Sequence, residues 1–104
     1  MSTVSSRVHN VDEQRQQAID ELVSDEGPDW HKRYEPGSFG CHELLDRTSL
    51  VADLVEQSLL SHPACILDRD WFALAERAVT ALRELYQRVG EKHLEDVSQP
   101  TDQP

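Results

Sequence analysis

The fold of this chain is decided by residues 36–90, which read PGSFGCHELLDRTSLVADLVEQSLLSHPACILDRDWFALAERAVTALRELYQRVG. Two stretches of this segment repeat apolar residues every three or four positions, which is the spacing of an amphipathic α-helix. Only six residues, 62–67, separate the two stretches, and a connection of that length favours antiparallel neighbours. The pattern therefore predicts an all-α fold centred on a long antiparallel helical hairpin, with helices over about residues 39–61 and 69–89.

Residues at the ends of both stretches predict where each helix begins and ends. Ser38 and Asp68 are N-cap residue types that stand directly before the apolar repeats. Pro63 prevents the first helix from continuing far beyond Ser61. Gly90 stands where a glycine commonly ends a helix, so the second helix is predicted to stop at about residue 89.

Both predicted helices carry more apolar surface than one neighbouring helix can cover. The main stripe of the first helix consists of Leu44, Thr48, Val51, Val55 and Leu59. The main stripe of the second helix consists of Trp71, Ala75, Ala78, Leu82, Leu85 and Val89. The apolar residues expected to remain for an interaction surface are Leu50, Leu54, Phe72, Val79 and Tyr86. A partner protein would cover this surface, or a second copy would cover it in a four-helix bundle.

The parts of the chain outside the hairpin have weaker patterns. Residues 1–9 are expected to be disordered, and residues 91–104 are expected to form a disordered acidic tail. A short amphipathic helix is expected over residues 10–24, where Asn10 is a suitable N-cap. Residues 10–90 would then form a single small helical domain, near the lower size limit for independent stability.

Composition excludes several classes of partner. The 104 residues include 20 acidic and 10 basic side chains, which gives a formal net charge of −10 at pH 7. This charge repels phosphate backbones, so no nucleic acid is expected to bind. No apolar run approaches the roughly 20 residues that span a bilayer, so no membrane is expected either. The start of the chain lacks the apolar segment of a signal peptide, and its two cysteines are expected to be reduced thiols of a cytoplasmic protein.

Residue types that carry chemistry gather at the start of the first predicted helix. Cys41, His42 and Glu43 are consecutive, and the hairpin places His93 near them. Such a mixed set can bind zinc or iron, or support thiol chemistry, because a helix N-terminus favours a thiolate. The preferred alternative is structural: Cys41 packs as a small apolar residue, His42 bonds locally and Glu43 complements the helix dipole. No cofactor is therefore predicted.

The turn between the helices holds a second pair of such residues. His62 and Cys65 flank Pro63 and could form a ligand-binding or redox tip. The simpler interpretation is a histidine at a helix C-terminus and a thiol packed under the turn. The sequence contains no phosphate-binding glycine loop, HExxH or GxSxG motif. No catalytic residue is therefore predicted, and no motif supports an enzyme.

The wide apolar arcs are the strongest indication of function. They favour a small, acidic, non-enzymatic protein–protein interaction module that acts through helix faces, either on a partner or on itself as a homodimer. The alternative is a small metal- or thiol-dependent protein with a site at Cys41, His42 and Glu43. A third hypothesis is an acidic protein that blocks a basic surface.

Overall fold

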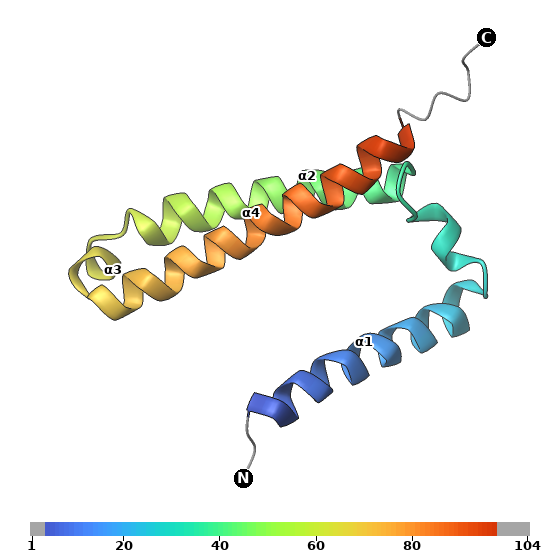
Figure 1. The fold of residues 1–104 in the computed structure, drawn as a ribbon, viewed down its shortest axis with the longest axis horizontal. Helices are drawn as coiled ribbons and strands as arrows, with labels where there is room; N and C mark the ends of the chain where they lie inside the picture. Colours follow the sequence, from blue (N-terminus) through green and yellow to red (C-terminus); the bar gives the residue numbers. More distant parts are fainter. Residues whose placement is uncertain (1–3, 98–104) are drawn as a thin grey trace. The chain divides into compact units, whose positions relative to one another are not determined.

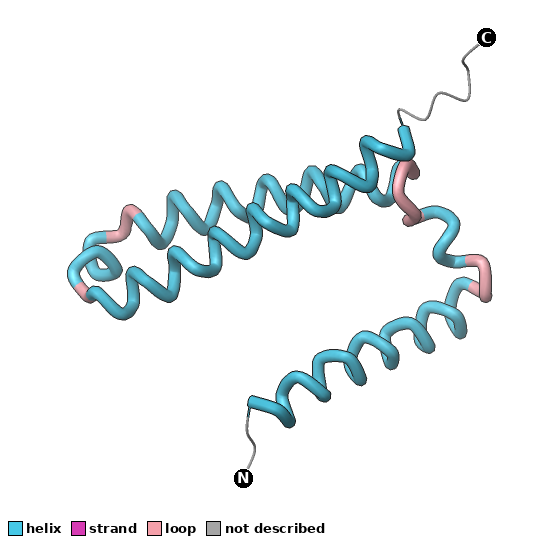
Figure 2. The backbone as a smooth tube through the Cα atoms, in the orientation of Figure 1, coloured by secondary structure: helices cyan, strands magenta, loops and turns pink. Residues whose placement is uncertain are grey.

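The structure is a computed structural model that describes the backbone of residues 4–97 and the side chains of residues 10–95. Across residues 4–97 every regular element is a helix and no strand occurs (Figures 1 and 2), which confirms the all-α prediction. Contacts divide the chain into two units, Met1–Lys32 and Arg33–Pro104, and each unit is described separately.

The first unit contains helix α1, Val4–Glu26, and a 3-10 helix, η1, begins at Trp30 and ends at Arg33. The helix starts six residues before the predicted Asn10, which therefore lies inside α1 and caps nothing. Residues 4–9 are helical where disorder was predicted, because Val4 and Val8 extend the apolar spacing and no glycine or proline interrupts it. Gly27, which follows α1, has a positive φ of 95°, and its N–H donates to the Val23 carbonyl.

Helix α2, Phe39–Val55, begins where the sequence predicts. Ser38 is its N-cap, and the Cys41 N–H donates to the Ser38 Oγ at 3.1 Å. The helical path continues through a π-helical segment, η2, Glu56–Leu60. The last turn of the predicted helix is therefore wider than an α-turn.

The predicted turn of residues 62–67 contains a short helix, α3, Pro63–Leu67. Pro63 occupies its first position, where the missing N–H costs nothing. His62 caps this helix, because its Nδ1 accepts the Ala64 N–H at 3.1 Å. His62 thus directly follows the C-cap of η2, Ser61, and also caps the start of α3.

Helix α4, Arg69–Val97, is longer than predicted. Asp68 caps it as expected, accepting the N–H groups of Asp70 at 2.9 Å and Trp71 at 3.0 Å. The predicted stop at Gly90 is wrong, since the helix runs seven residues further. Gly90 is buried, and a Cβ there would lie 3.6 Å from Cδ1 of Leu45, so this residue packs against α2 and does not end a helix. Residues 98–104 of the predicted tail lie outside the described residues.

Helices α2 and α4 lie side by side and run in opposite directions (Figure 1). The start of α2 lies beside the end of α4, where the rings of His42 and His93 have centroids 5.5 Å apart. Further along, Arg83 of α4 donates to Asp53 at 3.1 Å and to Glu56 at 2.6 Å. We call these two packed helices the α2–α4 pair.

The buried residues between α2 and α4 are mostly small, apart from Leu45 and His93. The buried residues of α2 are Cys41, Leu45, Thr48 and Ala52. The buried residues of α4 are Val79, Gly90 and His93. The Thr48 hydroxyl donates to the Leu44 carbonyl at 2.8 Å, which satisfies this polar group inside the interface. Thr48 is the only buried residue of the stripe predicted for the first helix. The reason is that α4 covers only one side of the wide apolar arc of α2.

Candidate functional site

A second apolar stripe on α2 remains uncovered in the α2–α4 pair. Leu44 and Val51 directly precede the buried Leu45 and Ala52. Adjacent residues of an α-helix differ by about 100° in direction, so this second stripe points about a quarter turn away from the buried one. Leu44 and Val51 are each more than two-fifths exposed.

Helix α4 repeats this arrangement. Trp71, Leu74, Ala78 and Leu85 follow one another at spacings of three, four and seven residues, so they share one side of the helix. Ala78 directly precedes the buried Val79, which again places the stripe about 100° from the packed side. Trp71 is 59% exposed and Leu74 is 57% exposed.

Both uncovered stripes lie on the same side of the α2–α4 pair. On each helix the exposed stripe precedes the buried stripe by one residue. Because α2 and α4 run in opposite directions, this same offset points both exposed stripes to one side of the pair. A hollow of about 560 Å³ supports this placement, because Leu59 lines it together with Trp71 and Leu74. We call this surface the apolar face; its large residues are Leu44, Val51, Leu59, Trp71, Leu74 and Leu85.

The other side of the pair is polar. Arg83 bridges Asp53 and Glu56 there. Its hydrogen bonds to these two carboxylates raise the pKa of Arg83 above its ordinary value, and the bond to Asp53 has the larger effect. At the start of α2, the His42 Nε2 lies 3.4 Å from an Asp46 carboxylate oxygen on the surface. Charge on this side makes it a solvent-facing surface.

The charges beside the apolar face have mixed signs although the whole chain is acidic. Arg88 and Lys92 line a second hollow together with Leu44 and Val89. Asp70 lies in the first turn of α4, at the opposite end of the helix. Glu91 also lines the second hollow, and Arg88 pairs with Glu84, so the charges at the Arg88 end of the apolar face have both signs.

The structure separates the five residues predicted as an interaction surface. Val79 is buried against α2 and is not available to a partner. Phe72 is 37% exposed and Tyr86 is 39% exposed, and each lies seven residues from Val79, on the side of α4 that faces α2. Leu50 is 68% exposed and lies about 100° around α2 from Val51, away from the apolar face. Leu54 is 59% exposed and follows Val51 by three residues, so it lies at the edge of the apolar face.

None of the six large residues of the apolar face was predicted as an interaction residue: five were assigned to the main stripes of the two helices, and Leu74 was assigned to neither set. The signal was present, because Leu74 completes the helical spacing set by Trp71 and Ala78. The sequence pattern did not single out Leu74 because α4 has apolar residues on several sides. Only the contacts with α2 show which of these residues stay exposed.

The residues predicted as alternative metal ligands do not form one cluster. His42 and His93 come together, but the Nδ1 of His93 already accepts the Gly37 N–H at 2.9 Å. Cys41 is buried, and Glu43 is bonded to Arg47 at 3.1 Å. In the part of the chain whose side chains are described, no three His, Cys, Asp or Glu residues group closely enough to hold a metal ion.

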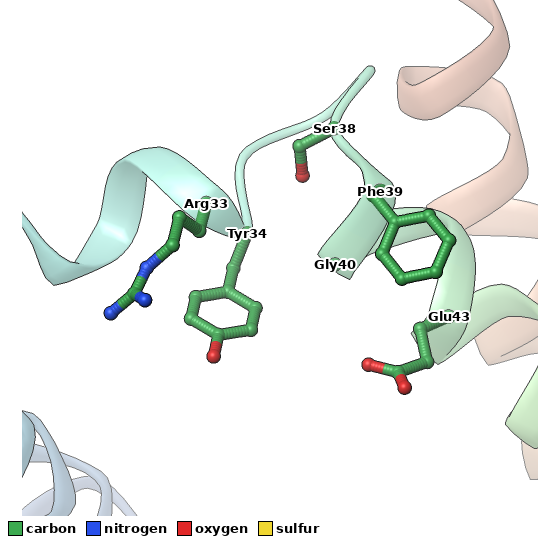
Figure 3. A pocket seen from close by; sticks show the side chains of 6 residues that line it. All are labelled: Arg33, Tyr34, Ser38, Phe39, Gly40 and Glu43. Atoms are coloured by element: carbon green, nitrogen blue, oxygen red, sulfur yellow. The ribbon is translucent and has the colours of Figure 1, made fainter.

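A third hollow, of about 390 Å³, lies at the start of α2. Figure 3 shows the rings of Tyr34 and Phe39 on two sides of it, with Gly40 behind them and the Glu43 carboxylate pointing into the space. A Cβ at Gly40 would lie only 2.4 Å from the Arg33 carbonyl oxygen and 2.4 Å from a Tyr34 ring carbon. Glycine at this position therefore lets the preceding segment pack directly on α2.

No protein-family model, curated protein or solved structure matches this chain. None of the helices in the described residues has the length and apolar character that crossing a membrane requires.

Proposed function

We propose that this protein is a small, non-enzymatic protein–protein interaction module and that it binds through the apolar face of the α2–α4 pair. The observation that carries this proposal is the row of large apolar side chains left about half-exposed on one side of two packed helices. Large contiguous apolar surfaces on soluble domains are characteristic of binding sites.

The composition of the face supports a protein partner. Trp71 lies next to Leu74 in a hollow, and tryptophan is among the residues that contribute most to protein interfaces. Arg88 and Lys92 at its border supply the polar rim that interfaces commonly have. The partner is expected to present its own apolar helix surface, because two parallel rows of side chains leave a groove between them.

Site-specific photo-crosslinking in living cells tests this proposal. A photoreactive amino acid at position 74, on the apolar face, should yield a defined protein adduct. The same amino acid at position 50, which is similarly exposed but lies on another side of α2, is the matched control and should yield little. Equal adducts at both positions, or none at position 74, would contradict a module that binds through this face.

A further inference from the structure

We infer that the apolar face is occupied by a second copy of this chain, whose α2–α4 pair packs on the first in an antiparallel four-helix bundle. This inference rests on the proposed function and names the partner. In this bundle α4 packs against α4 of the partner subunit, and α2 packs against α2 of the partner subunit.

The directions of the two stripes on each helix support a bundle. A helix in a four-helix bundle touches two neighbours that lie about a quarter turn apart around it. On α2, Leu45 faces the first neighbour and Leu44 points about 100° away. On α4, Val79 and Ala78 have the same relation. Each helix therefore already has one neighbour and presents a stripe in the direction of a second.

The residue spacing on α4 fits an antiparallel copy of itself. With a two-fold axis level with residues 79–80, Leu74 lies opposite Leu85 of the partner subunit, and Ala78 lies opposite Ala81 of the partner subunit. Small residues then meet at the centre, where the helices approach most closely, and leucines meet on both sides of it. Trp71 lies opposite Arg88 of the partner subunit, which permits a cation–π contact.

One charged contact is compatible with the same arrangement. Asp70 lies opposite Val89 of the partner subunit and next to Arg88 of the partner subunit, which also pairs with Glu84 of its own helix. Two-fold symmetry repeats this contact at the other end of α4. Asp53 and Glu56, which pair with Arg83, lie on the other side of each pair and do not face the interface.

The exposed area is sufficient for a dimer. From their exposed fractions, the six large side chains of the apolar face present on the order of 600 Å² per copy, and two copies would bury about 1,200 Å², the lower range of specific interfaces. Such a dimer is expected to be concentration-dependent and to dissociate in the micromolar range.

Sedimentation equilibrium of the full chain tests this inference with charge substitutions at positions 74 and 85. Leu74→Glu alone and Leu85→Lys alone each place a charge against a leucine at two symmetric contacts, so each should weaken dimerisation about 100-fold. The double variant Leu74→Glu/Leu85→Lys pairs these charges across the interface and should recover at least tenfold of that loss. Leu50→Glu is the matched control and should leave the dissociation constant unchanged, and circular dichroism should show the same helix content in all four variants.

Three results would overturn the inference. A wild-type chain that stays monomeric up to about 100 μM excludes the second copy as occupant. A dimer that Leu50→Glu dissociates while Leu74→Glu does not uses another face. A double variant as weak as the single ones excludes the antiparallel arrangement. If the chain is monomeric but position 74 still crosslinks to a different protein in cells, the proposed function stands and only the second copy is excluded.

Discussion

Two glycines inside helices show how one residue type has opposite effects at different positions. Gly40 and Gly90 both lie within helical segments and face a neighbouring segment. At Gly40 an added methyl group would meet backbone and ring atoms at 2.4 Å, whereas at Gly90 it would meet the end of a leucine side chain at ordinary contact distance. The two positions differ in the room available for a Cβ atom. They do not differ in needing a glycine backbone conformation, because neither glycine has a positive φ.

Alanine at these two positions should therefore change stability in opposite directions. Gly40→Ala forces the segment of Arg33 and Tyr34 away from α2 and should lower the free energy of unfolding by about 1–3 kcal/mol. Gly90→Ala removes a flexible residue from a helix interior without a clash and should raise it by about 0.5–1 kcal/mol. Denaturant unfolding at one fixed protein concentration measures both changes; a shift of the same sign in both variants would contradict the packing described here.

His93 links the end of α4 to the segment before α2. It is 5% exposed, and its Nδ1 accepts the Gly37 N–H, so its role is structural in the geometry observed. His93→Ala should cost about 1–3 kcal/mol, since it leaves a backbone donor unsatisfied and opens a cavity. His93→Asn keeps an acceptor close to the position of Nδ1 and should cost clearly less. Equal unfolding midpoints for the two variants would show that the hydrogen bond does not contribute.

At the scale of elements, single capping residues determine where α2 and α4 begin. Asp68 accepts two N–H groups of the first turn of α4. Asp68→Ala should lower the free energy of unfolding by about 1 kcal/mol, while Asp68→Asn, which keeps the accepting oxygen, should stay within a few tenths of a kcal/mol of the wild type. Thermal melts followed by circular dichroism measure the difference, and the cap contributes nothing if alanine and asparagine behave alike.

Helix starts could be predicted from the sequence more reliably than helix ends. Ser38 and Asp68 act through neighbouring atoms of the chain, so the local sequence contains the required information. Gly90 is compatible with a helix end or with close packing, and only contact with Leu45 decides between them. The short helix α3 was missed for a similar reason, because Pro63 indicates a break and also suits a first helical position.

The sequence predicts that an apolar interaction surface exists, but it does not predict which residues form that surface. The sequence shows that the apolar arcs exceed what one neighbour covers. Which side stays exposed depends on how α2 and α4 are rotated against each other, and the sequence pattern does not determine that rotation because both helices carry apolar residues on several sides. For this reason none of the six large residues of the apolar face was among the residues expected at the interaction surface, which were Leu50, Leu54, Phe72, Val79 and Tyr86.

At the scale of the whole molecule, Trp71 should report association. In a Trp30→Phe variant Trp71 is the remaining tryptophan, and it is largely exposed in a single copy. A dimer covers it, so dilution from about 100 μM to below 1 μM should shift its fluorescence to longer wavelength and increase quenching by acrylamide. The same variant carrying Leu74→Glu should show the exposed spectrum at every concentration. A spectrum that does not depend on concentration in either protein would contradict a dimer through this face.

The unit that begins at Arg33 should fold without the preceding residues. It contains both packed helices, their caps and the whole apolar face. A chain consisting of residues 33–104 should keep a cooperative unfolding transition and the association behaviour of the full chain. Loss of cooperativity in this fragment, measured by denaturant titration, would show that residues 1–32 contribute to the fold of the second unit.

The π-helical segment of residues 56–60 also bears on how the length of this chain can vary. A π-turn accommodates one residue more than an α-turn, so removing one residue there would relax the backbone to an ordinary α-helix. A deletion between Cys41 and Ala52 would instead rotate part of the buried stripe out of the interface. A natural deletion of one residue in descendants of this gene should therefore be tolerated at residues 56–60 and eliminated by selection within the first four turns of α2.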